Sequence, residues 1–147
     1  MQNLFVALLV MMFLAALAST AMSAEQEPPF KPVADVRQLM NAILIPSSDA
    51  LFEVGSKPPK DADAWTNVER AAVTLAESGN LLMIGSRAKR EAAWMQFARA
   101  LVDAGQEAVK AATKKNVDDV LAAGDKIYET CDGCHSKYMD KSDADSK

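Results

Sequence analysis

The pentapeptide Cys131-Asp132-Gly133-Cys134-His135 limits the chemistry of this chain more than any other stretch. The chain holds 2 cysteines and 1 histidine, and all three lie in this pentapeptide. A C-x-x-C-H pattern is typical of covalent haem attachment, because the two thiols add to the two vinyl groups of a haem and the next imidazole reaches the iron. The pattern therefore predicts one haem c per chain, attached through Cys131 and Cys134, with His135 as an axial iron ligand.

The residues before the pentapeptide predict that it lies on the last helix of the chain. Apolar residues and the three reactive side chains recur three or four positions apart, which places them on one face of a helix. They are Val117, Val120, Leu121, Gly124, Ile127, Tyr128, Cys131, Cys134, His135 and Tyr138. The thiols and the imidazole then point inward with the apolar residues, so we expect the haem inside the fold, near the end of this helix.

Three other interpretations of the pentapeptide compete with haem attachment. A thioredoxin-like redox pair lies at the start of a helix after a strand, where the thiol pKa is lowered, and no strand pattern precedes Cys131. A structural zinc site normally takes four ligands, and Asp132 lies on the wrong side of the helix to be the fourth. A simple disulfide leaves His135 without a role. Haem attachment is therefore the preferred interpretation.

The composition favours a helical fold without an electrostatic affinity for polyanions. Half of the 147 residues are hydrophobic, and there are only 6 glycines and 6 prolines. No alternating strand pattern is present. The formal net charge is −4, which gives the chain no electrostatic reason to bind nucleic acid or anionic lipid. We therefore expect no nucleic-acid partner.

The N-terminal residues 1–24 are typical of a secretory signal peptide. An apolar run from Leu4 to Leu17 precedes small residues that end at Ala24, as in a cleavable signal. The run is shorter than the roughly 20 residues that span a bilayer, although an uncleaved anchor is the alternative. We expect cleavage after Ala21 or Ala24, export to a bacterial periplasm, and no stable membrane insertion after cleavage. Residues 25–32 form a leader, and 142–147 form a polar tail.

Four helical patterns occupy 33–141, with turn residues between them. The first covers 33–52 and is expected to kink or break at Pro46, which lacks an amide donor. The second begins at Asp61 or Asp63 and ends in the apolar run 81–84, the third covers about 88–112, and the fourth carries the pentapeptide. Short connections favour an all-α, antiparallel, up-down-up-down four-helix bundle, with the haem near one end.

The sixth iron ligand and the walls of the haem pocket are predicted less directly. Because His135 is the only histidine, the sixth position is a methionine, another side chain, water or vacant. Met40, in mid-stripe on the first helix, is our candidate, and a thioether suits ferrous iron; Met83 and Met95 fit less well, and core packing is the alternative for all three. The expected pocket residues are Trp94 and Tyr138 as walls, and Arg37 and Arg87 as propionate partners, with ordinary packing and solvated surface positions as their alternatives.

These features together resemble the class II c-type cytochromes, the group of cytochrome c′ and cytochrome c-556. The resemblance rests on a signal peptide, four helices, the C-terminal C-x-x-C-H and the segment Arg37-Gln38-Leu39-Met40, and it covers about 28–141. It implies that Met40 is the sixth ligand and that Arg37 binds a propionate. Pro46 and the run 81–84 depart from the family pattern.

The sequence and the resemblance predict a soluble periplasmic monohaem electron carrier that exchanges electrons with redox partner proteins. No catalytic constellation is present, so we expect no enzyme activity; family habit adds a homodimer as a form the chain can take. The first alternative is a five-coordinate haem protein that binds NO or CO as a sink or sensor, as high-spin family members do. The second is a haem-free helical protein with a redox-active or structural Cys131–Cys134 pair.

Overall fold

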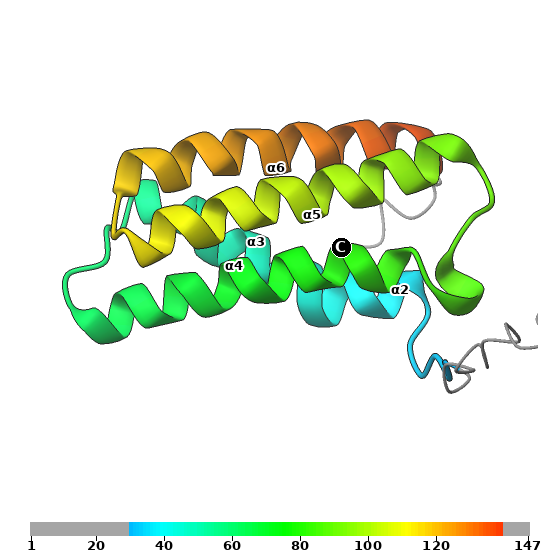
Figure 1. Cartoon of the computed structure of the whole chain (residues 1–147), viewed down its shortest axis with the longest axis horizontal. Helices are drawn as coiled ribbons and strands as arrows, with labels where there is room; N and C mark the ends of the chain where they lie inside the picture. The colour runs from blue at the N-terminus through cyan, green and yellow to red at the C-terminus, as the bar shows by residue number, and fades with distance from the viewer. Residues whose placement is uncertain (1–29, 140–147) are drawn as a thin grey trace, which may run out of the picture.

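The computed structural model describes residues 30–139, and every regular element among them is helical (Figure 1). The expected signal peptide 1–24, most of the leader 25–32 and the tail 142–147 lie outside the described residues. The elements are α2 (Val36–Leu39), the π-helical turn η1 (Met40–Leu44), α3 (Ile45–Phe52), the 3₁₀ turn η2 (Glu53–Gly55), α4 (Ala62–Leu82), the 3₁₀ turn η3 (Gly85–Arg87), α5 (Ala92–Thr113) and α6 (Val117–Tyr138). Since α2 to η2 are consecutive, residues 30–139 form four long helical segments, with the short turn η3 between the second and the third.

Three of these segments begin at a side chain that caps the free backbone N–H groups of the first turn. Asp35 accepts from the N–H of Gln38, and the side chain of Gln38 accepts in return from the N–H of Asp35. Asp61 accepts from the N–H of Ala64 at 2.8 Å, so α4 begins where an acidic start was expected. Asn116 caps α6 in the same way.

Pro46 does not break the first segment, which stays helical from Val36 to Gly55. The π-helical turn η1 ends at Leu44, two residues before Pro46, and the N–H of Ile45 donates to the carbonyl of Met40. Pro46 then falls in the first turn of α3, where a missing N–H is tolerated. π-Helical turns inside α-helices often lie at functional sites.

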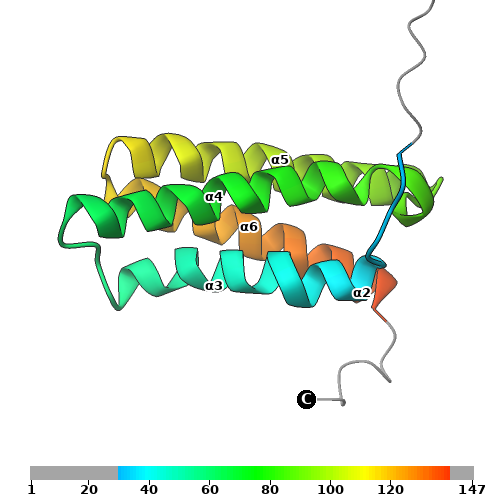
Figure 2. The same ribbon diagram turned by 90° about the horizontal axis from the view of Figure 1, so that it is seen from below.

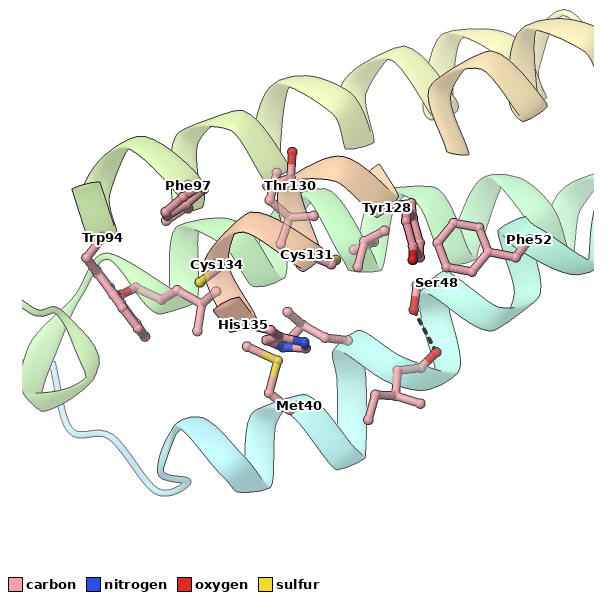
Figure 3. A pocket seen from close by; sticks show the side chains of 16 residues that line it. Met40, Ser48, Phe52, Trp94, Phe97, Tyr128, Thr130, Cys131, Cys134 and His135 are labelled. Atoms are coloured by element: carbon pink, nitrogen blue, oxygen red, sulfur yellow. Dashed lines mark hydrogen bonds between the residues drawn. The ribbon is translucent and has the colours of Figure 1, made fainter. Parts of the chain in front are cut away.

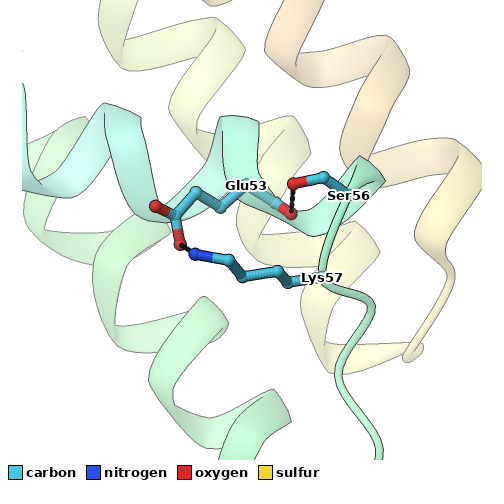
Figure 4. A network of polar contacts seen from close by, with 3 residues as sticks. All are labelled: Glu53, Ser56 and Lys57. Carbon is cyan, nitrogen blue, oxygen red and sulfur yellow. Dashed lines mark hydrogen bonds and ion pairs between the residues drawn. The ribbon is translucent and has the colours of Figure 1, made fainter.

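The first helical segment ends in a tight polar turn (Figure 4). The hydroxyl of Ser56 donates to the carbonyl of Glu53 at 3.2 Å, and the same carbonyl accepts from the backbone N–H groups of Ser56 and Lys57. Lys57 Nζ also lies 3.2 Å from the Glu53 carboxylate, with both side chains largely exposed. An exposed ion pair contributes little to stability, so the hydrogen bonds to the Glu53 carbonyl are the main local contacts of the turn.

Two expected helix boundaries were wrong. The third helix, α5, begins at Ala92 rather than near Ala88. Ala88 has an extended backbone (φ −67°, ψ 118°), because the chain leaves η3 there and crosses to the start of α5. Val33 precedes the Asp35 cap and is 96% exposed rather than part of the first helix. The run 81–84 is divided: Leu82 is the buried last residue of α4, and Ile84 is extended and exposed.

The helical segments lie alongside one another along the long axis of the molecule (Figures 1 and 2). α5 packs against both α4 and α6, and α3 packs against α4 and α6 on the other side. The core between them includes Leu51, Val54, Leu75, Val120 and Ile127, all almost fully buried. The arrangement is compatible with a helical bundle, and it brings α2, the start of α5 and the end of α6 to one end of the molecule.

Candidate functional site

One cavity collects the residues that the sequence singles out for chemistry (Figure 3). Cys131, Cys134 and His135 are half-buried on the last turns of α6, and all three line the cavity. Its volume is about 130 Å³. The complete lining is Met40, Leu44, Ile45, Ser48, Phe52, Leu75, Leu82, Trp94, Phe97, Ala98, Leu101, Tyr128, Thr130, Cys131, Cys134 and His135. The predicted inward face of α6 is thus confirmed for the pentapeptide, although Tyr128 on the same stripe is 62% exposed.

Met40 and His135 meet across this cavity from opposite sides. Met40 is half-buried at the first position of η1, while His135 lies near the end of α6. Figure 3 shows the Met40 thioether and the His135 imidazole pointing toward one another. A soft sulfur and an imidazole nitrogen on opposite sides are the two axial donors of Met/His-ligated haem iron, so the donor set fits the group that the sequence predicts.

A row of residues spaced by four places Met40 in the cavity. Met40, Leu44, Ser48 and Phe52 all line it from the first helical segment. In an α-helix of 3.6 residues per turn, steps of four drift gradually around the axis. The π-helical turn at Met40–Leu44 takes in more residues per turn and offsets part of that drift. The local backbone before Pro46 therefore keeps Met40 on the same face as Ser48 and Phe52.

Aromatic side chains from α5 form the wall at the end of the cavity. Trp94 is 3% exposed, and its indole N–H donates to the carbonyl of Leu82 at 2.9 Å. Tyr138 does not line the cavity itself, but its ring packs edge-on against Trp94 with a centroid distance of 5.1 Å. The Tyr138 hydroxyl donates to Glu91 at 2.9 Å. Tyr138 thus supports the wall from behind, and Trp94 is part of it.

The mouth of the cavity is apolar and open to solvent. Ile45, Phe52 and Tyr128 line the cavity, yet they are 44%, 40% and 62% exposed. Large apolar side chains gathered at one concave place are typical of a binding site for an apolar ligand. A planar apolar ligand at this mouth would cover these three side chains, so the lining is chemically suited to a porphyrin.

Burial raises the pKa of both thiols. The pKa of Cys131 is raised by desolvation and then by the neighbouring Cys134. The pKa of Cys134 is also raised by desolvation, against the opposing charge of Lys89. A redox-active C-x-x-C pair depends on a lowered thiol pKa, so the environment here disfavours that alternative. Both thiols are free in the structure.

Gly133, inside the pentapeptide, is in close contact with α5. A Cβ atom at this position would lie 2.8 Å from Cε1 of Phe97, which is shorter than van der Waals contact. The missing side chain therefore lets the end of α6 approach α5 with Phe97 in place. Phe97 in turn stands in the cavity wall beside Trp94.

Neither arginine expected at the pocket lines the cavity. Arg37 is exposed on α2. Arg87 is 6% exposed, and its guanidinium lies 5.0 Å from the ring centroid of Phe30.

Sequence reasoning missed several cavity residues, and two of them had a usable signal. Phe52 belongs to the four-residue row that starts at Met40, and Phe97 follows Trp94 by three positions on α5. Tyr128 was placed on the α6 face but not assigned to the site. The apolar mouth, in contrast, depends on how far the first segment and α6 stand apart, which no periodicity in one helix reveals.

Within residues 30–139, no three His, Cys, Asp or Glu side chains form a group suited to hold a bare metal ion. An iron inside a porphyrin needs only axial donors from the protein. None of the helices described here is both long and apolar enough to span a bilayer. Comparisons of the chain with protein-family models, with curated proteins and with solved structures find no match.

Proposed function

We propose that this chain is a periplasmic monohaem c-type cytochrome that carries electrons. In this proposal Cys131 and Cys134 would hold one haem c through thioether bonds, and His135 and Met40 would be the protein ligands of its iron. The haem supplies a one-electron Fe(III)/Fe(II) couple when bound. The proposal includes an antiparallel order of the four helices, membership of the class II c-type cytochromes, and no enzyme activity.

The observation that carries the proposal is the convergence of four side chains on one cavity. Both thiols and the imidazole line it from α6, and the Met40 thioether faces the imidazole from η1. Two thiols, an imidazole and a thioether are the groups that a c-type haem with Met/His ligation requires. Their convergence depends on the fold, because Met40 and His135 are far apart in the sequence.

The residues of the chain have separate roles in this function. A methionine ligand raises the reduction potential of haem iron, since a thioether favours the ferrous state. The apolar lining from Leu44, Leu75 and Leu101 keeps water from the iron, and a low local dielectric disfavours the more highly charged ferric state. The open mouth at Ile45, Phe52 and Tyr128 leaves one edge of the site near the surface, where a redox partner protein approaches.

The experiment that tests the proposal compares two methionine variants. Met40→Ala removes the proposed ligand, and Met95→Ala is the matched control, because Met95 is also half-buried but lies outside the cavity lining. Both are produced in a host that matures c-type cytochromes, and the reduced visible spectra are recorded with and without CO.

We expect wild type and Met95→Ala to be low-spin and unreactive toward CO, and Met40→Ala to be high-spin and to bind CO. If Met40→Ala keeps the wild-type spectrum, Met40 is not a ligand. If the wild type itself is high-spin and binds CO, the chain is a five-coordinate gas-binding protein rather than an electron carrier.

A further inference from the structure

Arg87 is a buried cation with two donor atoms that have no partner. Its side chain is 6% exposed, and Nε and Nη2 are buried without a hydrogen bond. Its Nη1 atom donates to the carbonyl of Ala34 at 3.4 Å, which is long for a hydrogen bond. Within residues 30–139, no Asp or Glu forms an ion pair with Arg87. An unpaired buried charge is strongly unfavourable, so an anion bound to this guanidinium would stabilise the folded protein.

The two unpaired atoms lie on the same edge of the guanidinium. Nε–H and Nη2–H of an arginine point in parallel directions and match the two oxygens of a carboxylate. The Nη1 atom, on the other edge, is the one that Ala34 already uses. The free edge therefore has the geometry for a bidentate carboxylate pair rather than for a single water or carbonyl.

Phe30 covers this guanidinium from the side of the solvent. Its ring centroid lies 5.0 Å from Cζ of Arg87 and the side chain is 48% exposed. Gly85 has φ +64°, and a Cβ there would lie 2.9 Å from the Phe30 ring. A glycine is therefore required both by the backbone conformation and by the aromatic ring packed over the turn. The half-exposed Phe30 ring does not belong to the buried core cluster.

We propose that Arg87 is a buried carboxylate-binding site at the turn between α4 and α5. The carboxylate takes its place on the Nε and Nη2 edge, beneath or in place of the Phe30 ring. Its source is either a haem propionate or a free carboxylate from solution. The propionate source rests on the proposed function: Leu82 and Trp94, on either side of this turn in the sequence, both line the cavity.

The first test is a crystal structure of the haem-loaded full chain grown without carboxylates, followed by the same crystals in sodium acetate. We expect an oxygen within about 3.2 Å of both Nε and Nη2. A propionate oxygen in the first crystal identifies the haem as the source, and an acetate that appears only in the second identifies a free carboxylate. If both crystals leave the edge without a carboxylate, the proposal is overturned.

A solution test separates a built site from an adventitious ion. Arg87→Gln is compared with Arg90→Gln, an exposed neighbour three positions along. For a free carboxylate, sodium acetate raises the thermal midpoint of wild type and Arg90→Gln more than sodium chloride at equal ionic strength, and Arg87→Gln removes this difference. An acetate seen in the crystal without that difference is an adventitious additive only, and it overturns the proposal.

For a haem propionate, the readout is the reduction potential. Arg87→Gln lowers the potential more than Arg90→Gln does, because removal of a buried cation favours the ferric state, and acetate has no effect on either. An equal potential in both variants, with a propionate absent from Arg87 in the crystal, overturns this source. If Arg87→Gln does not fold, Arg87→Lys replaces it in the acetate comparison, because it keeps the charge but loses the two-donor edge; we expect it to lose the acetate-specific stabilisation.

The two proposals fail separately. A colourless protein refutes the proposed function, while the acetate arm still tests Arg87. Phe30→Ala tests the cover: we expect half-maximal stabilisation at a lower acetate concentration than in wild type, and an unchanged concentration dependence contradicts a role for Phe30.

Discussion

Gly105→Ala is expected to destabilise the protein, although alanine is the better helix former. Gly105 lies in the middle of α5 and is buried against α4. A Cβ atom there would lie 2.8 Å from both Cα and Cβ of Ala76 and 3.0 Å from its backbone nitrogen. Because two of these three atoms belong to the backbone, no rotamer change relieves the contact. The two helices must move apart by several tenths of an ångström.

The expected change combines two opposing terms. Replacement of a helical glycine by alanine favours the folded state by about 1 kcal/mol. Overpacking of a close contact costs about 1–3 kcal/mol, and the backbone contact at Ala76 places this site at the upper end. We therefore expect the free energy of unfolding to fall by about 1–2 kcal/mol.

Gly124→Ala on α6 is the matched control. Gly124 is also helical and buried, but a Cβ there would meet only the Phe52 ring at 3.6 Å, an ordinary van der Waals distance. This variant gains the helix propensity without the clash, so its free energy of unfolding rises by about 1 kcal/mol.

Urea unfolding followed by circular dichroism measures both variants on the same haem-loaded protein, with the slope against urea as a check on cooperativity. The reasoning is refuted if Gly105→Ala is as stable as wild type or more stable. It is also refuted if the two variants change stability by the same amount and in the same direction.

Three further predictions concern the site. Cys134→Ser leaves at most one thioether bond, so acid–acetone extraction removes more haem from it than from wild type; full retention in the variant counts against the attachment role. In the haem-free chain, burial raises the pKa of both thiols, so iodoacetamide reacts with them more slowly than with free cysteine at pH 8. The rate keeps rising above the pH at which free cysteine is fully ionised, and a rate equal to that of free cysteine contradicts this environment. Tyr138→Phe loses the hydroxyl that donates to exposed Glu91 but keeps the ring against Trp94, so the thermal midpoint changes little and the visible spectrum is unchanged. A thermal midpoint that falls as far as that of Tyr138→Ala contradicts a supporting role of the ring alone.

The parts of this fold that follow from local periodicity were predictable from the sequence. The last helix, its inward residues Val120 and Ile127 and the start of α4 after Asp61 are decided by residues within a few positions of one another. An apolar stripe and a capping side chain act over one or two turns. The confirmed features therefore have short-range causes.

The features that sequence reasoning missed depend on contacts between elements. The π-helical turn at Met40–Leu44 has two causes: Pro46 lacks an amide donor, and the first segment packs on α4 and α6. Only the first cause is visible in the sequence. The start of α5 at Ala92 depends on how the chain crosses from η3 to α5. Close to this crossing, the indole N–H of Trp94 on α5 donates to the carbonyl of Leu82 at the end of α4. Arg87 was expected at the cavity, but it lies under Phe30, a residue 57 positions earlier.

The candidate site was predictable in its chemistry but not in its shape. The residue types and spacing of Cys131, Cys134 and His135 indicate haem attachment without any knowledge of the fold. The apolar mouth, in contrast, is formed by Phe52 and Tyr128, which come from two segments far apart in the sequence. Met40 falls between these cases, since its helical register was readable and its position opposite His135 depends on tertiary packing.

The measurement that tests the proposed function most directly is the visible absorption spectrum of the purified protein, oxidised and reduced, from a host that matures c-type cytochromes. Haem attached covalently to Cys131 and Cys134, with its iron ligated by His135 and Met40, gives sharp α and β bands on reduction, no response to CO, and no loss of colour on acid–acetone extraction. A colourless protein, or one whose haem is extracted completely, contradicts the account.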